Sequence, residues 1–446
     1  MIKTVLNKLY CAFAFTILLC LFVLPISAND DVNEMNVDID DRAGAVYLYN
    51  YESDRVLVSH RTSEPMLPAS TAKMMTGIVV CENYFDKLDE SVIITEQMLD
   101  GHTGTSMNLQ VGMEVTIRTL LHGTICGGNN DAALALAIAC SGSIRAFVDE
   151  MNQFANRLYM NDTHYKNPTG LDANDARTTL ADVARLARYV SKNKLYVSIS
   201  SLPSFTFYAN GTEVSTVYNR NALHSQFSAA GYVNKYATGL NAGSTDNGGY
   251  VLATLAQKND MTYLCVVMGA SADASNIYSY STANQILSKA FDNYSLQKIA
   301  SAGDIFAEPE TTYTLVDGTA VKLPCAISSD LNVVLKDGTK IKDDITYKIY
   351  FNDNTLSAPI RAGDVVGGVN VYCKDVLVGR AILLAASDVE PNLILYSLKQ
   401  MKDFISGRVF IIGFLLSIVS VFLYVYFDSK NLRYKKVKTV RYSKFS

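Results

Sequence analysis

The stretch Pro68-Ala69-Ser70-Thr71-Ala72-Lys73-Met74-Met75-Thr76 opens an apolar helix near the start of the chain. A helix that begins at Ser70 places Ser70 and Lys73 one turn apart on the same face. A hydroxyl beside an amine is a nucleophile beside a candidate base. The start of a helix also disfavours a nearby cation, which lowers the pKa of the lysine, and its free backbone N–H groups can hold an oxyanion.

The Ser-x-x-Lys pattern alone is weak, because it recurs at Ser191–Lys194 and Ser295–Lys298, which we interpret as solvated helix faces or turns. By pattern alone, Ser70 is equally an ordinary helix cap. The difference is the apolar continuation over residues 74–80, because a charged amine at the start of a core helix is costly. We therefore predict that Ser70 and Lys73 are catalytic.

Two apolar segments near the chain ends predict export and a membrane tether. Lys3 and Lys8 precede an apolar run that ends in small residues, so residues 1–28 are predicted to be a signal peptide. The second run, residues 409–427, is uncharged and spans ~28 Å as a helix, which suits a hydrocarbon core of about 30 Å. Its length and flanks disfavour a buried core helix.

The charges around the second run predict its orientation. Residues 408–427 are expected to cross the cell membrane once, and the basic tail 428–446 to lie in the cytoplasm, with the body of the chain outside. The net charge of −4 becomes −12 for residues 29–427 once the +2 of the signal and the +6 of the tail are removed. A body this acidic predicts no nucleic-acid partner.

Histidine and cysteine spacings point to no metal or cofactor. The five histidines form no metal-ligand spacing, so a zinc peptidase is disfavoured, and we predict that no metal or cofactor is used. The six cysteines outside the signal show no close pairing, and we infer no disulfide from them.

The body divides into two parts by pattern. Residues 43–297 begin with an alternating hairpin at Ala45–His60 and return to strand at Tyr250–Gly269, with helical periodicity between. This order predicts an α/β (α+β) domain whose antiparallel sheet is built from both ends and whose helical lobe is inserted. Residues 298–389 read as short strands separated by turns, which predicts a small all-β sandwich.

Two connecting segments complete the predicted organisation. Residues 29–42 are acidic and predicted to be a flexible leader. Residues 390–407 are predicted to be a linker between the β domain and the membrane helix.

Several motifs, in their order along the chain, resemble the low-molecular-weight penicillin-binding proteins, the serine D-alanyl-D-alanine carboxypeptidases. No single motif is sufficient, but their order makes chance an unsatisfactory explanation. The resemblance covers most of residues 43–389. It rests on Pro68–Lys73, Asn130-Asp131-Ala132-Ala133, Asn167-Pro168-Thr169-Gly170-Leu171, Thr178-Thr179-x-x-Asp182, Asn221-x-Leu223 and Ala358-Pro359-Ile360-x-x-Gly363.

The resemblance implies a transpeptidase-like domain followed by a β-sandwich, and a reaction that removes the terminal D-alanine of a peptidoglycan stem peptide. In that scheme Ser70 attacks the amide carbonyl while Lys73 takes its proton, and water then releases the acyl group. The oxyanion would lie on the backbone N–H groups of Ser70 and Ser244. A β-lactam would acylate Ser70 because it mimics the substrate.

The second motif of that family, Ser-Gly-Asn, is altered here. Alignment on Asp131 gives Gly128-Asn129-Asn130, so Asn130 is kept and the serine hydroxyl that relays protons is absent at Gly128. Cys126, two residues earlier, would be a poor substitute.

The third motif, Lys-Thr-Gly, is also altered. The best register places Asn241-Ala242-Gly243 in those positions, with Ser244 and Thr245 completing the predicted substrate-binding strand. A rival register through Ala237-Thr238-Gly239 keeps the threonine but breaks the downstream match. Asn241 offers a hydrogen bond in place of a lysine but no charge for a substrate carboxylate.

The altered motifs leave alternatives open. One interpretation is a D-Ala-D-Ala carboxypeptidase, slow if the missing groups matter. The other is a catalytically impaired relative that binds peptidoglycan or an envelope protein. A β-lactamase is disfavoured, because a membrane tether and a β domain are typical of a resident cell-wall protein.

Overall fold

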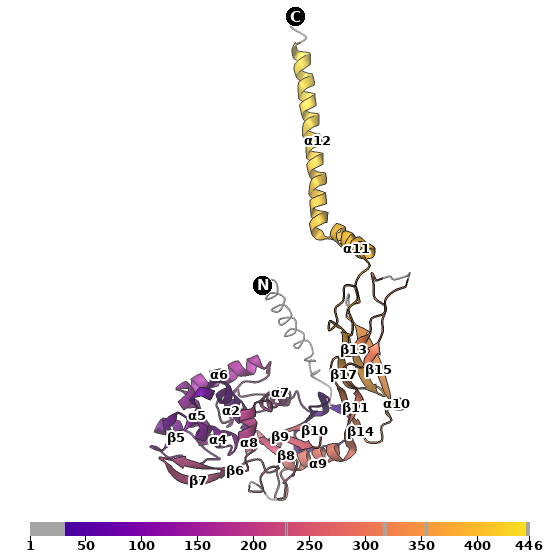
Figure 1. Ribbon diagram of the computed structural model, residues 1–446. Helices are drawn as coiled ribbons and strands as arrows, with labels where there is room; N and C mark the ends of the chain where they lie inside the picture. Colours follow the sequence, from indigo (N-terminus) through magenta and orange to yellow (C-terminus); the bar gives the residue numbers. More distant parts are fainter. Residues whose placement is uncertain (1–31, 228, 230, 315–318, 353–355, 443–446) are drawn as a thin grey trace. The chain divides into compact units, whose positions relative to one another are not determined.

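The computed structural model describes residues 32–227, 229, 231–314, 319–352 and 356–442 (Figure 1). The predicted signal peptide lies outside these residues. Two compact units are formed. The first runs to Gln297 and also contains residues 332–344, whereas the second holds residues 298–331 and the chain from 345 onward. The sequence assigned 332–344 to the β domain.

Residues 332–344 group with the first unit because of a pairing between strands that are distant in the sequence. Strand β14 (Leu331–Lys336) pairs with β11 (Tyr294–Ala300), and the 3.3 Å hydrogen bond from Arg55 to the Val334 carbonyl ties it to the first unit. Val334 is buried in the core of that unit. The short helix α10 (Ile341–Asp344) follows.

The first unit is built on one six-stranded antiparallel sheet in the order β1-β3-β2-β10-β9-β8. Strands from both ends of the domain therefore share one sheet, as predicted. The strands are β1 (Val32–Asn33), β2 (Ala45–Asn50), β3 (Arg55–His60), β8 (Ala237–Thr245), β9 (Gly249–Lys258) and β10 (Met261–Ala270). Strand β8 forms one edge of this sheet, which leaves its outer side open to the helical lobe.

The inserted lobe is mainly helical (Figure 1). Its helices are α2 (Ala72–Asn83), α3 (Glu96–Leu99), α4 (Ile117–Ile125), α5 (Asn130–Ser141), α6 (Ile144–Arg157), α7 (Leu180–Val190) and α8 (Lys194–Ser200). Two small two-stranded antiparallel sheets accompany them, β4 (Ser91–Ile93) with β5 (Glu114–Thr116) and β6 (Ser204–Ala209) with β7 (Thr212–Tyr218). Helix α9 (Tyr278–Asn293) follows the sheet.

Both faces of the sheet are buried, which explains the near-continuous apolar strands. Along β10, Leu264 and Val266 pack into the core shared with the lobe, whereas Cys265 and Val267 pack into the core shared with α9. Alternate side chains of a strand point to opposite faces, so one strand supplies both cores.

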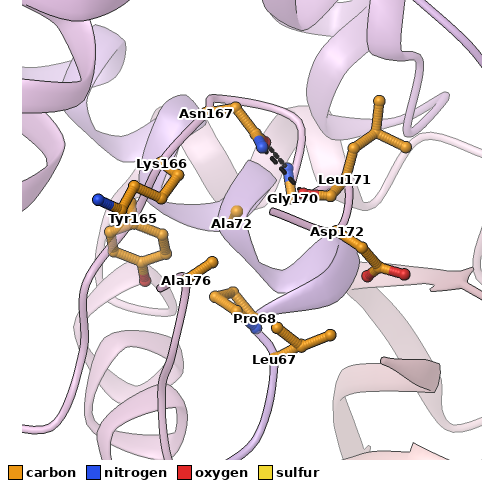
Figure 2. Close-up of a pocket in the computed structure, with 10 residues that line it drawn as sticks. All are labelled: Leu67, Pro68, Ala72, Tyr165, Lys166, Asn167, Gly170, Leu171, Asp172 and Ala176. Atoms are coloured by element: carbon orange, nitrogen blue, oxygen red, sulfur yellow. Dashed lines mark hydrogen bonds between the residues drawn. The ribbon is translucent and has the colours of Figure 1, made fainter. Parts of the chain in front are cut away.

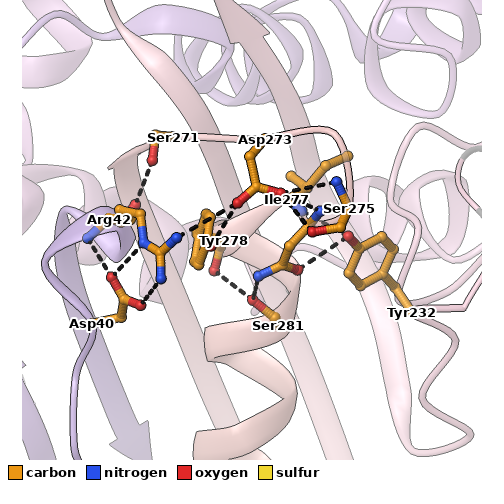
Figure 3. A network of polar contacts seen from close by, with 10 residues as sticks. Asp40, Arg42, Tyr232, Ser271, Asp273, Ser275, Ile277, Tyr278 and Ser281 are labelled. Carbon is orange, nitrogen blue, oxygen red and sulfur yellow. Dashed lines mark hydrogen bonds and ion pairs between the residues drawn. The ribbon is translucent and has the colours of Figure 1, made fainter.

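The segment predicted to be a flexible leader is instead packed from residue 32 onward. Strand β1 pairs with β3, and Met35 and Val37 are buried beside α9. Arg42 follows in the short 3-10 helix η1 (Asp41–Ala43), where its guanidinium lies over the Tyr278 ring and pairs with Asp273 (Figure 3). The prediction rested on the acidic composition of the segment and did not take the apolar residues Met35 and Val37 into account.

The second unit is centred on one five-stranded antiparallel sheet in the order β12-β13-β17-β16-β15. Isolated bridges accompany this sheet among the described residues, and the predicted all-β character of this part of the chain is confirmed. Its strands are β12 (Ile305–Ala307), β13 (Cys325–Ile327), β15 (Ile345–Phe351), β16 (Val365–Cys373) and β17 (Val376–Ala385).

Two helices end the described chain. The predicted linker contains α11 (Leu393–Ser406), and α12 (Arg408–Tyr442) follows. Within the described chain, one helical segment, Phe410–Lys430, is long enough and apolar enough to cross a membrane. None of its apolar residues is buried. Helices α5 and α6 together also pass that test, but they meet at 89° and α5 is buried in the core.

The exposed apolar surface of α12 predicts that it tethers the protein. Ending the chain after Glu390 should move the protein from the membrane fraction to the soluble fraction. The truncation removes the apolar surface of α12, which favours a membrane because it would otherwise be exposed to water. Fractionation of cells that express each form, with a salt wash, measures this. A truncated protein that stays with washed membranes would place the tether elsewhere.

Candidate active site

The site begins where the Pro68–Thr76 stretch turns into a helix. Ser70 lies in a 3-10 turn, η2 (Ala69–Thr71), and α2 begins at Ala72, so the α-helix starts two residues later than predicted. The predicted pairing nevertheless forms, because Lys73 Nζ lies 3.1 Å from Ser70 Oγ. Both residues are buried, with an exposed fraction of 4% for Ser70 and 3% for Lys73.

Lys73 is a buried amine without a counter-ion. Its second hydrogen bond, at 2.7 Å, goes to the backbone carbonyl of Thr169, and it forms no ion pair with any residue that the structure describes. Burial, and to a smaller extent the positive charge of Arg220, lowers the pKa of Lys73 to about 7. The amine is thus available as a neutral base near physiological pH.

Strand β8 places Gly243 directly against Ser70. A Cβ atom added to Gly243 would lie 2.5 Å from Ser70 Oγ, so only a glycine fits this approach. The rival glycine, Gly239, instead lies against the Ser200 carbonyl, 2.0 Å from where its Cβ would be. This geometry favours the register that contains Asn241-Ala242-Gly243.

The two faces of β8 divide the predicted substrate-binding residues. Asn241 and Thr245 share the face of Gly243, since strand side chains alternate. The side chain of Ala242 points the other way into the α9 core, so its backbone alone is available to a ligand. The hydroxyl of Thr245 already accepts the Gly248 N–H at 3.1 Å.

The free edge of β8 also presents backbone groups. The Ala242 carbonyl lies 3.6 Å from the Cβ position of Gly128, which is on the side away from β9. In an antiparallel strand, N–H and C=O of one residue point to the same side, and alternate residues repeat this direction. The N–H of Ser244 therefore points outward as well.

The second motif enters from the start of α5. Asn130 is its first residue, and its side-chain N–H donates to the Thr103 carbonyl at 2.6 Å rather than to Ser70 or Lys73. The Oδ1 atoms of Asn130 and Asn241 are both buried and accept no hydrogen bond within the described chain. Each retains capacity for a ligand.

Packing constrains what two positions of this motif can do. Gly128 has φ +63, and Arg220 and Ala242 surround its Cβ position at 3.5 Å or more, so a side chain has space but a strained backbone. Cys126 is fully buried, and its thiol points to the Leu202 carbonyl at 3.6 Å. Burial raises the pKa of Cys126 to about 12, so its thiol is no substitute for a serine hydroxyl.

Sequence reasoning missed Arg220 and Thr169. The Arg220 side chain is exposed, begins beside Gly128 and Ala242, and pairs with no acidic residue of the described chain. Thr169 contributes a carbonyl, which no residue type reveals. Both sit inside motifs that carried the resemblance, or directly before one, and that position was the available signal.

Comparison with known proteins identifies the family. The sequence model described as D-alanyl-D-alanine carboxypeptidase, peptidase S11, matches residues 31–272, which is more than half of the chain. The chain belongs to the peptidase S11 family of D-alanyl-D-alanine carboxypeptidases. Residues 294–391 match the C-terminal domain of penicillin-binding protein 5.

Individual relatives agree with this family. The chain is 24% identical over 365 residues to the D-alanyl-D-alanine carboxypeptidase DacF of Bacillus subtilis, covering 81% of the chain and 89% of the relative. It is 27% identical over 371 residues to DacA of Escherichia coli K12, covering 80% and 87%.

Solved structures show the same fold. The D-alanyl-D-alanine carboxypeptidase DacD of Francisella tularensis superposes with a TM-score of 0.64 at 23% identity, covering 81% of this chain and 97% of that one. Penicillin-binding protein 5 of Haemophilus influenzae gives 0.62 at 24% identity, covering 82% and 99%. These likenesses establish the fold.

The lowered pKa of Lys73 predicts a pH profile. A base must be neutral to accept a proton, so acylation of the protein by penicillin should rise with pH, be half-maximal near the pKa of about 7, and level off above it. The acylation rate measured from about pH 5 to about pH 9 checks this. A rate that still climbs in proportion to hydroxide at the upper end would show that Lys73 is not the base.

Proposed function

We propose that the chain is a serine-type D-Ala-D-Ala carboxypeptidase that acts on peptidoglycan stem peptides through an acyl-enzyme on Ser70. The observation that carries this proposal is the buried Lys73 amine, 3.1 Å from Ser70 Oγ and without a carboxylate partner among the described residues. Such an amine is a base, because an ammonium ion in this position would lack compensation.

The chemistry follows from that pair. Lys73 accepts the hydroxyl proton as Ser70 Oγ bonds to the carbonyl carbon of the penultimate D-alanine. When the C–N bond breaks, the terminal D-alanine leaves as an amine and takes a proton from Lys73. A water molecule then attacks the ester, Lys73 again transfers the proton, and Ser70 is restored.

The negative charge on the carbonyl oxygen would be held by backbone donors. The N–H of Ser70 lies at a helix start, and the N–H of Ser244 points out of the free edge of β8. Two such donors, fixed before the reaction, are the usual composition of an oxyanion hole.

The altered motifs change two supporting roles. At Gly128 no hydroxyl stands between Lys73 and the leaving group, so Lys73 itself delivers the proton. At Asn241 no cation faces the substrate carboxylate. We infer that Arg220 supplies that cation, because its side chain begins beside Gly128 and Ala242 and no acidic residue of the described chain neutralises it. A guanidinium binds a carboxylate with two hydrogen bonds.

We further propose that the enzyme works outside the cell membrane. The apolar Phe410–Lys430 segment of α12 supports a single crossing with a cytoplasmic tail. β-Lactams are then expected to reach and acylate Ser70.

A second function is favoured by the same two positions. Without a hydroxyl at 128 and a cation at 241, the chain would bind stem peptides or an envelope protein without turnover. The assay below separates this alternative from catalysis.

The test is D-alanine release from diacetyl-Lys-D-Ala-D-Ala by the detergent-solubilised chain. Wild type should release D-alanine and Ser70→Ala should not. Arg220→Gln should raise KM roughly ten- to a hundredfold, since a charged hydrogen bond is worth about 1.5–3 kcal/mol. Adding Asn241→Lys to Arg220→Gln should recover part of that loss, because a cation returns to the site-facing side of β8.

Arg118→Gln is the matched control, because Arg118 is a half-exposed arginine whose partner is Asp89 on the surface. No D-alanine release by wild type would support the binding function instead. An unchanged KM in Arg220→Gln would leave the carboxypeptidase assignment intact and overturn the role of Arg220.

A further inference from the structure

The Asn167–Leu171 loop is organised by one side chain. The Oδ1 atom of Asn167 accepts hydrogen bonds from Thr169 N (3.2 Å), Thr169 Oγ1 (2.8 Å) and Gly170 N (2.7 Å), and its Nδ2 donates to the Leu171 carbonyl (2.9 Å). Figure 2 shows Asn167 pointing back into the loop toward Gly170. The backbone conformation of the loop therefore depends on Asn167.

The loop is pressed against the start of the catalytic helix. Gly170 has φ +80, and a Cβ atom there would lie 1.7 Å from the Ala69 carbonyl oxygen, directly beside the nucleophile. On α2, the Thr76 hydroxyl donates to the Pro168 carbonyl at 2.7 Å. The position of the Thr169 carbonyl relative to Lys73 is thus fixed from both sides.

The hydrogen-bonding capacity of the Lys73 amine suggests a function for the Thr169 carbonyl. A neutral amine has two N–H donors and one lone pair. The Thr169 carbonyl can only accept, so it holds one N–H of Lys73, and the amine can then turn its lone pair toward the Ser70 hydroxyl at 3.1 Å. We propose that Asn167 is a positioning residue, which fixes the Thr169 carbonyl so that Lys73 faces Ser70 as a proton acceptor.

This inference rests on the proposed role of Lys73 as the base. Among the described residues, the charge that acts on Lys73 is that of Arg220, and Asn130 and Asn241 on the neighbouring α5 and β8 are neutral. The carboxylate of Asp131 on α5 is held by Ser106 and by the backbone of residues 107 and 109. A change in the pKa of Lys73 when residue 167 is altered therefore reflects a change in its hydrogen bond to the Thr169 carbonyl.

The direction of that change follows from the charge. A carbonyl acceptor stabilises the ammonium form more than the neutral amine, so it raises the pKa of Lys73 relative to a site without it. Loosening the loop should therefore lower the pKa of Lys73 further and, separately, reduce the rate at pH values where the amine is fully neutral.

The experiment compares Asn167→Ala with Asn152→Ala in the full-length, detergent-solubilised chain. Asn152 is the matched control, because it holds the preceding segment through two hydrogen bonds to the backbone of Tyr165, and the hydrogen bonds that organise residues 167–171 come from Asn167 and Thr169 instead. The titration midpoint of Lys73 is followed by NMR of the lysine ε-carbon, assigned with Lys73→Arg. The rate of acylation by penicillin is followed over the same pH range.

Asn167→Ala should lower the midpoint by about half a pH unit and the plateau acylation rate roughly tenfold, whereas Asn152→Ala should change neither. Asn167→Asp keeps the acceptor oxygen and should restore much of the plateau rate. Its charge should move the midpoint above that of wild type.

An Asn167→Ala midpoint equal to that of wild type, or an equal shift in Asn152→Ala, would overturn the positioning role. The NMR arm does not depend on turnover. A chain that is not acylated at all, with the midpoint still moved by Asn167→Ala alone, would count against the proposed acyl-enzyme while supporting the positioning of the Thr169 carbonyl against Lys73 by Asn167.

Discussion

The proposed active site depends on one constraint, the burial of the Lys73 amine beside Ser70 without a counter-charge among the described residues. An ammonium ion at this depth would lose its hydration and gain one carbonyl and one hydroxyl as partners, which is poor compensation. The folded chain therefore favours the neutral amine, and the positive charge of Arg220 adds to this preference. Basicity, which the reaction requires, is the consequence of where the fold places this lysine.

The sheet and the lobe hold the partners of that lysine on separate elements. Ser70 and Lys73 come from the start of α2, Thr169 from the Asn167–Leu171 loop, and Gly243 from the edge strand β8. Each approach is close enough that a larger residue would collide, as the Cβ positions of Gly170 and Gly243 show. An edge strand suits this task, because its outer N–H and C=O groups remain available to a peptide substrate.

The sequence predicts features that follow from local patterns, but not features that depend on contacts between residues distant in the chain. The Ser70–Lys73 pair and the shared sheet follow from local spacing and alternation, and both are present. The packing of Met35 and Val37 was missed, because two apolar residues among acidic ones carry no periodicity. The grouping of residues 332–344 with the first unit was not predicted, because the pairing of β11 with β14 is a long-range contact. The proposed roles of Arg220 and the Thr169 carbonyl depend on tertiary packing, and their position in or beside the Asn221-x-Leu223 and Asn167–Leu171 motifs marks the segments without indicating which group acts.

The central claim is that Ser70 is the nucleophile that Lys73 activates. Intact-mass measurement of the protein after penicillin treatment tests it most directly. Wild type should gain the mass of one opened β-lactam, and both Ser70→Ala and Lys73→Ala should remain unmodified over the same time. An adduct that persists in Ser70→Ala would contradict the account, because the attacking atom would then belong to another residue.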